Sequence, residues 1–267
     1  MNLDIYTSEM AKSIWDKSFF MDKIPGVKCI IDFGCADGAM IRFLGKLFPD
    51  IDFIGYDLSP VLIARAESTA PFLANVAYFN HYTDVFDYVT LTKKFKPDEI
   101  CVNFSSVLHE VFSSTGGKED IEHLVEELQP KFITIRDMYC DDPVAYPSST
   151  TPHEEVVPIL DKITEKYTYA REKMQDYAKH FGKLENWRDV THLLMKFQWV
   201  NNGWNDELKE NYFSWTLNDM FKLCPNYSPI FECRYQLPYL SEEWRKSYGW
   251  YNPDVHTHAQ FILRRDD

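Results

Sequence analysis

The sequence has no long apolar run, no closely spaced cysteine pair and no excess of basic residues, and each absence excludes a class of protein. No apolar run approaches the roughly twenty residues that a membrane-spanning helix needs, so no membrane anchor is expected. The six cysteines form no C-x-x-C pair and several lie in apolar runs, which indicates reduced, buried thiols in place of disulfides or a zinc site. A net charge of -13 argues against extended nucleic-acid binding.

The remaining composition is that of a folded cytoplasmic protein. Residues 1–20 carry scattered charges and no apolar segment, which does not fit a signal peptide. Together with the cysteine pattern, this predicts a cytoplasmic location. A hydrophobic content of 45% supports a packed core, and 267 residues suffice for one α/β domain with a large insertion.

Strand and helix patterns alternate through the first half of the chain. Strands are expected at 27–33, 51–56, 76–79, 99–104 and 132–135, and helices at 8–23, 39–48, 60–70 and 118–128. This alternation predicts a doubly wound parallel sheet. Two further strands are expected at 230–237 and 259–263.

The pattern changes after Asp137. A Pro-rich loop is expected at 141–151, one long helix at 153–181, an aromatic-rich stretch at 187–204 and a helix at 216–223. A second loop, with Trp244, Tyr248, Trp250 and Tyr251, is expected between the last two strands.

The most informative segment is Ile30-Ile31-Asp32-Phe33-Gly34-Cys35-Ala36-Asp37-Gly38. A buried strand ends in an acidic residue, and small residues then recur at every second position before a helix begins. Small residues allow a sharp turn and a close approach of the backbone to a ligand. The G-x-A-x-G spacing does not match the G-x-G-x-x-G of dinucleotide-binding oxidoreductases, and Gly116-Gly117-Lys118-Glu119 does not match a P-loop.

A second carboxylate stands at the end of the next strand, in Ile54-Gly55-Tyr56-Asp57. Its distance from the glycine-rich turn is roughly the twenty residues at which an acidic side chain reaches ribose hydroxyls in nucleoside-binding sheets. Asp57 is therefore the expected ribose ligand.

These two motifs, with Asp32 to Gly38 and Tyr56-Asp57-Leu58-Ser59-Pro60, resemble the first two motifs of the class I S-adenosylmethionine-dependent methyltransferases. The resemblance implies a doubly wound, mostly parallel seven-stranded sheet. It also implies that S-adenosylmethionine is the cofactor, with Asp32, Gly34 and Gly38 along its methionine part, Asp57 at the ribose and Leu58 on the adenine. The usual middle glycine is Ala36 here, which leaves slightly less room.

The resemblance continues at Asn103-Phe104-Ser105-Ser106-Val107-Leu108-His109-Glu110, which follows the fourth strand. In the family this loop runs beside the sulfonium and faces the acceptor, so Asn103 and Ser105 are expected near the cofactor. His109 and Glu110 are candidate bases for the proton that the acceptor loses. The alternative is that His109 packs on or caps the following helix while Glu110 is solvated.

Further candidates are weighed against structural roles. Asp137, at the carboxyl end of the fifth strand, is expected either to bind the acceptor or to pair with Arg136 or another cation. Lys17 is a candidate for the methionine carboxylate, although lysine is rarely buried and a solvated side chain is the alternative. His256 and His258 lack a third ligand, so no metal is expected.

The acceptor half of the chain is less legible. Five aromatic residues either wall an acceptor pocket or form the core of the insertion: Trp187, Trp199, Trp204, Tyr212 and Trp215. The expected division is a cap helix with the cofactor-binding half at 1–140, a mostly helical lid at 141–212, and the last helix with the final two strands at 213–267. A small molecule is the leading acceptor and a protein or peptide side chain the next; the rivals to methyl transfer are other chemistry on the cofactor and a non-catalytic binding module.

Overall fold

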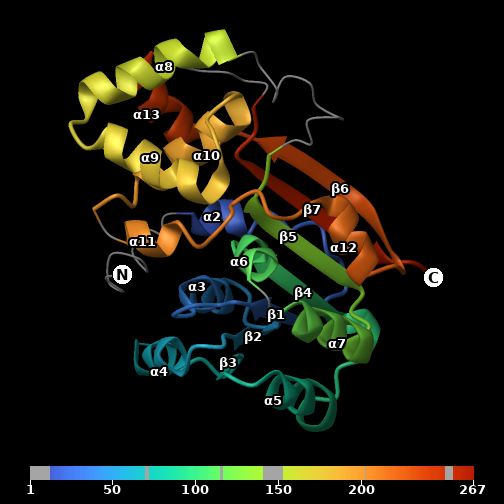
Figure 1. The fold of residues 1–267 in the computed structure, drawn as a ribbon. Coiled ribbons are helices and arrows are strands. Elements are labelled where there is room, and N and C mark those ends of the chain that lie inside the picture. Colours follow the sequence, from blue (N-terminus) through green and yellow to red (C-terminus); the bar gives the residue numbers. More distant parts are fainter. Residues whose placement is uncertain (1–12, 70–71, 115–116, 141–152, 202, 250–254) are drawn as a thin grey trace. The chain divides into compact units, whose positions relative to one another are not determined.

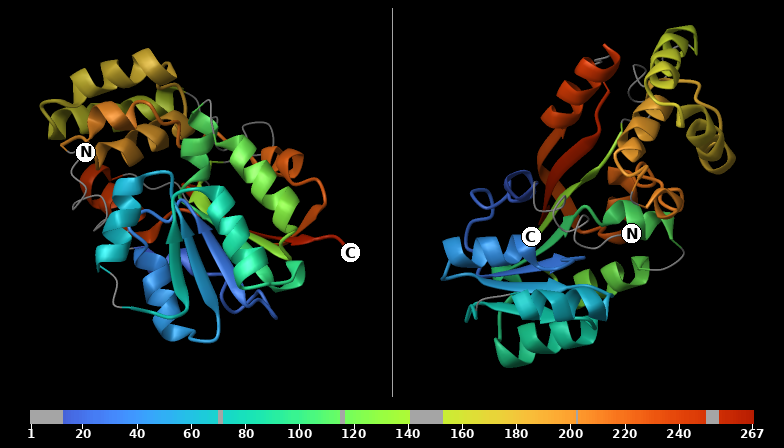
Figure 2. Two further views of the ribbon diagram at one scale, coloured as in Figure 1. Left: turned by 90° about the horizontal axis from the view of Figure 1, so that it is seen from below. Right: turned by 90° about the vertical axis from the view of Figure 1, so that its left-hand side faces the viewer.

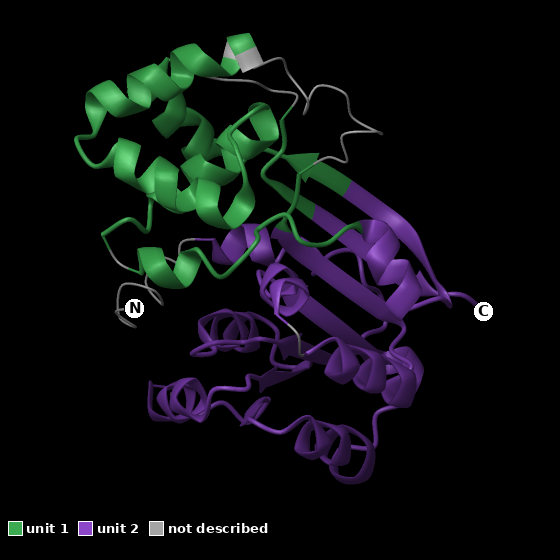
Figure 3. Cartoon of the chain, viewed as in Figure 1, with its two compact units in different colours: residues 1, 138–216, 233–259 green, residues 2–137, 217–232, 260–267 purple. Residues whose placement is uncertain are grey.

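The computed structural model describes residues 13–69, 72–114, 117–140, 153–201, 203–249 and 255–267 (Figure 1). The chain divides into two compact units (Figure 3). Unit 1 contains residue 1 with 138–216 and 233–259, and unit 2 contains 2–137, 217–232 and 260–267. The three-part division expected from the sequence stays a prediction, and the Pro-rich loop at 141–151 lies outside the described residues.

Seven strands form one sheet in the order β3-β2-β1-β4-β5-β7-β6. The strands are β1 (Cys29–Phe33), β2 (Asp52–Tyr56), β3 (Val76–Phe79), β4 (Ile100–Ser105), β5 (Phe132–Met138), β6 (Tyr227–Tyr235) and β7 (His258–Arg265). Each of the seven expected strands is present, β5 being three residues longer than expected because Arg136 still pairs with Ser105 of β4. The doubly wound, mostly parallel seven-stranded sheet is therefore confirmed.

The five strands from β1 to β5 are parallel, and β7 is antiparallel to β5. The direction of β7 follows from backbone hydrogen bonds at the two ends of β5. The Tyr139 N–H donates to the Thr257 oxygen, whereas the Arg265 N–H donates to the Lys131 oxygen, so residue numbers run in opposite directions. The carboxyl ends of β1, β2, β4 and β5 thus share one edge, where open α/β sheets bind ligands.

Both faces of the parallel strands are covered, which is why these strands read as continuous apolar runs. Figure 2 shows α3 (Ala39–Leu47) and α4 (Pro60–Thr69) on one face, and α5 (Tyr82–Asp87) and α7 (Lys118–Leu128) on the other. On the first face, Ile30 and Phe53 share one core cluster with Ile41 of α3. The other helices described in unit 2 are α2 (Ile14–Lys17), α6 (Leu108–Ser113) and α12 (Leu217–Leu223), with a π-helix at Tyr88–Thr92 and a 3-10 helix at Pro97–Glu99.

The helix expected at 8–23 is wrong at its carboxyl end, since α2 stops at Lys17. The chain continues in turns, in which the Met21 N–H donates to the Ser18 oxygen and the Lys23 N–H to the Phe20 oxygen. These three-residue turns accompany the complete burial of Phe20 in the core beneath β1. Residues 8–12 lie outside the described part of the chain.

Unit 1 contains α8 (His153–Lys166), α9 (Ala170–Phe181), α10 (Trp187–Phe197), α11 (Trp204–Glu207) and α13 (Pro238–Tyr248). The single helix expected at 153–181 is wrong, because the chain breaks at 167–169, where Tyr167 and Tyr169 stack with ring centroids 5.4 Å apart. The aromatic loop expected between the last two strands is also wrong at Trp244 and Tyr248, whereas Trp250 and Tyr251 lie outside the described residues. Pro238 begins a helix there, and Leu240, Trp244 and Tyr248 form its buried stripe at four-residue spacing.

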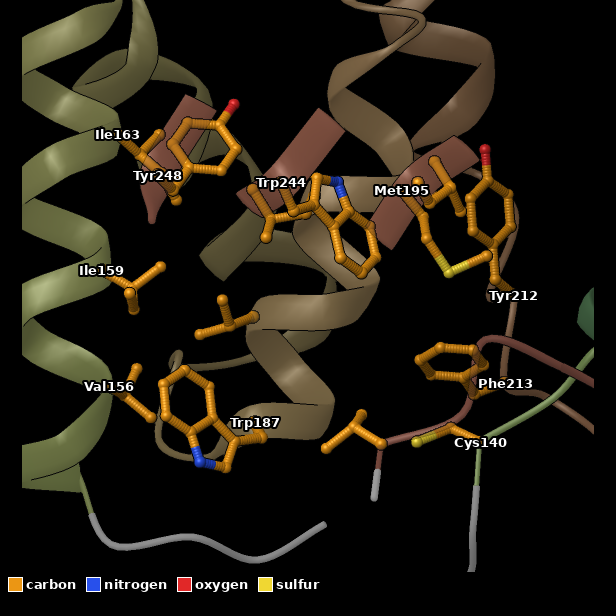
Figure 4. Close-up of a cluster of buried hydrophobic side chains, with 14 of the residues drawn as sticks. Cys140, Val156, Ile159, Ile163, Trp187, Met195, Tyr212, Phe213, Trp244 and Tyr248 are labelled. Atoms are coloured by element: carbon orange, nitrogen blue, oxygen red, sulfur yellow. The ribbon is translucent and has the colours of Figure 1, made fainter. Parts of the chain in front are cut away.

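The core of unit 1 is rich in aromatic side chains. Figure 4 shows Trp187, Trp244 and Tyr248 among the aliphatic side chains of α8, such as Ile159 and Ile163. Among the described residues, no helix has both the length and the apolar character that crossing a membrane requires.

Candidate functional site

The turn after β1 has the backbone conformation that its small residues allow. Gly34, Ala36 and Gly38 all have positive φ angles, of 78°, 50° and 70°. A Cβ on Gly34 would lie 2.5 Å from a methyl group of Val107, and one on Gly38 would lie 2.4 Å from the Tyr78 ring. Both glycines are therefore required by contact as well as by conformation, whereas Ala36 adopts the left-handed region as a non-glycine residue.

Asp57 holds this turn against the end of β2. Its Oδ2 accepts a hydrogen bond from the Ala36 N–H at 2.9 Å, and its Oδ1 accepts one from the Ser59 N–H at 2.9 Å. Burial raises the pKa of the Asp57 carboxyl above its ordinary value. The next residue, Leu58, is 67% exposed, so its apolar side chain is available to a ligand.

A hydrogen-bonded chain of side chains crosses three neighbouring strands below the turn. Asn103 of β4 donates from Nδ2 to Asp32 Oδ1 at 2.7 Å, and Thr134 of β5 donates from Oγ1 to Asn103 Oδ1 at 2.8 Å. The three residues face each other because they occupy the same register position of β1, β4 and β5. Asn103 is fully buried, so it orients the Asp32 carboxylate from inside the sheet.

Lys17 of α2 is buried, with 8% of its surface exposed, so the solvated alternative is wrong. Burial, followed by the charge of Arg136, lowers the pKa of Lys17 to about 8, while Asp32 acts in the opposite direction. Burial likewise raises the pKa of Asp32 to about 7, against the effects of its Asn103 hydrogen bond and Lys17. Unit 2 thus holds a buried cation and a buried carboxyl that influence each other.

These groups border one cavity of unit 2. Its wall combines Lys17 of α2, Asp32 of β1, the turn residues Gly34 and Ala36, and Ser105 at the end of β4. Ser105 Oγ is buried and has no hydrogen-bond partner among the described residues. A buried hydroxyl without a partner is costly to the protein unless a ligand or water supplies the hydrogen bond.

His109 and Asp137 form a buried pair at the carboxyl ends of β4 and β5. The His109 ring Nδ1 lies 2.7 Å from Asp137 Oδ1, and the His109 backbone N–H donates to Asp137 Oδ2 at 3.0 Å. Their side chains are 3% and 0% exposed. Since an ionised carboxylate only accepts, Nδ1 carries the proton, and Nε2 is the basic nitrogen of the neutral ring.

Glu110, the other candidate base, lies at the edge of this pair. The Glu110 side chain is 46% exposed, and its Oε1 lies 4.0 Å from His109 Nε2. Arg136 does not pair with Asp137, because its guanidinium binds Asp16 of α2 and Ser106. Asp16 and Ser106 were not predicted; Ser106 lay in the loop that carries the resemblance, but no local pattern marked Asp16.

The aromatic residues considered for an acceptor pocket, and His258, which was considered for a metal, have buried side chains. Trp187, Trp199, Trp204, Tyr212 and Trp215 are buried, and three of them, Trp187, Trp204 and Tyr212, belong to hydrophobic core clusters, as the core alternative expects. His258 is buried with its Nδ1 2.9 Å from Thr257 Oγ1, and its ring lies 6.1 Å from that of Tyr235.

Comparison with known proteins agrees with this geometry. A family model described as a methyltransferase domain matches residues 8–141, just over half of the chain. No curated protein sequence matches the chain. The fold is similar to that of a SAM-dependent methyltransferase from Anabaena variabilis, with a TM-score of 0.50 and 12% identity over 96% of this chain and 84% of that one.

Two further solved structures show weaker likeness. One is an S-adenosylmethionine-dependent methyltransferase from Mesorhizobium loti, with a TM-score of 0.47 and 14% identity over 91% of this chain and 93% of that one. The other is human N-acetylserotonin methyltransferase in complex with SAM, with a TM-score of 0.43 and 12% identity over 96% of this chain and 52% of that one.

The chemistry of the cavity of unit 2 fits the methionine part of the cofactor of this family. A zwitterionic amino acid with a sulfonium needs a cation, a carboxylate and hydrogen-bond donors beside a backbone that it can approach closely. The cavity offers Lys17, Asp32, the partnerless hydroxyl of Ser105 and the turn at Gly34. The chain belongs to the methyltransferase domain family, and its cofactor is S-adenosylmethionine.

Proposed function

We propose that the chain transfers the methyl group of S-adenosylmethionine to an O–H or N–H of a small-molecule acceptor, with His109 as the base. The observation that carries this proposal is the buried contact between His109 Nδ1 and Asp137 Oδ1 at 2.7 Å. This pair lies at the carboxyl edge of the sheet, and His109 follows Ser105 of the cofactor cavity by four residues.

In this proposal, the methionine part of the cofactor lies in the cavity of unit 2. Lys17 meets its carboxylate, Asp32 its ammonium group, and Ser105 Oγ supplies a further hydrogen bond. Gly34 and Gly38 keep the turn close, and Asn103 acts indirectly by fixing the Asp32 carboxylate.

The nucleoside part follows the turn and the end of β2. Asp57 already accepts one backbone N–H on each carboxylate oxygen, and each oxygen has a second lone pair for a ribose hydroxyl. Ala36 supplies backbone beside this carboxylate. Leu58 provides an exposed apolar surface for the adenine.

Bound S-adenosylmethionine supplies an electrophilic methyl group on a sulfonium. The acceptor atom then needs alignment with that methyl and a destination for its proton. His109 Nε2 receives the proton, and the ionised Asp137 stabilises the imidazolium that results. Glu110, which is half-exposed, is the alternative base.

The acceptor class rests on composition and on the proposed lid. A net charge of -13 disfavours a nucleic-acid acceptor. We propose that residues 141–212 act as a lid that selects the acceptor, since the part of this segment that is described is largely helical, in α8, α9, α10 and α11. A protein or peptide side chain remains the other outcome of the test below.

The test is methyl transfer from S-adenosylmethionine with a trideuterated methyl group. Purified chain is incubated with pools of hydroxylated and amino small molecules, and separately with peptides, and mass spectrometry follows the label and S-adenosylhomocysteine. Labelled small molecules that disappear with His109→Gln, but persist with His123→Gln on the exposed side of α7, are expected. Cofactor breakdown without a labelled acceptor would indicate other chemistry, and absence of cofactor binding would overturn the proposal.

A further inference from the structure

Arg136 connects two segments that border the cofactor cavity. It is 3% exposed and lies near the end of β5. Its Nε donates to Asp16 Oδ2 at 2.6 Å, and Nη2 lies 2.6 Å from the same oxygen. On its other side, Nη1 donates to Ser106 Oγ at 2.9 Å. One guanidinium thus holds both α2 and the loop after β4.

The attachment of α2 depends on Asp16. Asp16 also accepts two hydrogen bonds from Gln260 of β7. The Gln260 Nε2 donates to Asp16 Oδ1 at 3.0 Å and to the Asp16 backbone oxygen at 3.1 Å. Helix α2 has only four residues, which is far below the length at which a helix is stable on its own. Its position is therefore set by tertiary contacts, and Asp16, directly beside Lys17, makes a charged one with Arg136.

The attachment of the loop depends on Ser106. This residue has a φ of 56°, in the left-handed region that non-glycine residues rarely adopt. The Ser106 N–H donates to the Arg136 oxygen at 2.8 Å, and its Oγ accepts from the Arg136 side chain. Both the backbone and the side chain of Arg136 therefore maintain a strained residue that, like Ser105, borders the cavity.

We propose that Arg136 is a positioning residue for the cofactor: through Asp16 it places Lys17, and through Ser106 it places the opposite wall of the cavity. The inference rests on the proposed function, in which Lys17 meets the methionine carboxylate. The planar fork of arginine suits this double attachment, because separate N–H groups reach Asp16 and Ser106 at fixed angles.

The test measures binding of S-adenosylhomocysteine by calorimetry. Arg136→Gln, and independently Asp16→Asn, should raise its Kd by about tenfold or more, the effect of losing a hydrogen bond to a charged group. Arg265→Gln is the matched control, since it removes an arginine paired with Asp98 at the far end of β7. That control should bind as the unchanged chain does, and thermal unfolding verifies that every variant is folded.

A combination with Lys17→Met separates positioning from general loss of structure. If Arg136 acts on the ligand largely through Lys17, then adding Arg136→Gln to Lys17→Met weakens binding by much less than it does alone. Equal weakening in both backgrounds overturns the placement of Lys17 by Arg136, and unchanged binding by folded Arg136→Gln and Asp16→Asn overturns the inference as a whole. If the unchanged chain itself does not bind S-adenosylhomocysteine, the proposed function fails instead.

Discussion

Arg136 and Asp137 are consecutive residues of β5, yet their side chains serve different partners. Arg136 reaches Asp16 of α2, and Asp137 reaches His109 of α6. Successive side chains of a strand point to opposite faces, so one dipeptide contributes to two assemblies. In the proposals above, Arg136 positions the walls of the cofactor cavity, whereas Asp137 supports His109 as the base. Substitution of Arg136 should therefore change cofactor affinity, and substitution of Asp137 should change turnover.

The first prediction concerns the proposed base. His109→Gln should lower turnover by about a hundredfold or more, the range of general acid–base catalysis, and leave cofactor affinity nearly unchanged. Asp137→Asn should also lower turnover, because the amide no longer stabilises the imidazolium. Steady-state kinetics across pH test this, and the limb of the profile due to His109 should vanish in His109→Gln. If it persists there but vanishes in Glu110→Gln, Glu110 is the base.

Cofactor affinity should depend on Asp57. Asp57→Ala should weaken binding by about 1.5–3 kcal/mol, the usual scale for losing a hydrogen bond to a charged group. Part of this effect comes from the turn, since Ala36 also loses its acceptor. Asp52→Ala is a control on the same strand, where the carboxylate pairs with Lys93. Equal affinities of Asp57→Ala and the unchanged chain, by calorimetry, would contradict the ribose assignment.

Cofactor binding should have a maximum between about pH 7 and pH 8. Burial raises the pKa of Asp32 to about 7 and lowers that of Lys17 to about 8, so both groups are charged mainly between these values. Affinity should therefore fall as Asp32 gains a proton at lower pH and as Lys17 loses one at higher pH. Asp32→Asn should remove the acidic limb and Lys17→Met the alkaline limb. A flat profile for the unchanged chain would show that this pair does not hold the ligand.

The same carboxyl should affect the stability of the cofactor-free chain with a definite sign. Because the pKa of Asp32 is raised from 3.8 to about 7, the folded state binds its proton more tightly than the unfolded state. Its stabilising contribution is present below about pH 4 and is lost as the pH rises towards 7. The difference in unfolding free energy between the unchanged chain and Asp32→Asn, measured by urea titration, should follow this trend.

Gly34 allows contact and conformation to be measured separately. Gly34→Ala should destabilise the chain by about 1–2 kcal/mol through its φ of 78°, and further through the 2.5 Å approach to Val107. Gly249→Ala is the control, because its backbone also has a positive φ, of 62°, but the added Cβ would meet only the flexible end of the Lys162 side chain, at 3.2 Å. Urea denaturation should therefore show the larger loss for Gly34→Ala. Equal losses would mean that Val107 moves aside readily.

The sequence predicted best what neighbouring residues determine. The buried strands β1 and β2, the glycine turn and the acids Asp32 and Asp57 all follow from local pattern. The break between α8 and α9 could not be seen, because no Gly or Pro marks residues 167–169. The burial of Lys17 and the Arg136–Asp16 pair depend on residues 120 positions apart that only the folded sheet brings together.

The side-chain hydrogen bonds across β5, β4 and β1 all have the same donor-to-acceptor direction, from Thr134 through Asn103 to Asp32. The carboxylate of Asp32 only accepts, so Asn103 presents its NH2 to it and its oxygen to Thr134, which must then donate. The Thr134 hydroxyl can then only accept from the Cys101 thiol, whose sulfur lies 3.8 Å from Thr134 Oγ1 and 3.8 Å from the Val102 backbone oxygen. Asp32 on β1 thus determines the direction of the Thr134 hydroxyl on β5, two strands away. Thr134→Val would remove the donor to Asn103 Oδ1, and the Asp32 carboxylate would then be oriented by an amide that is anchored at one end only.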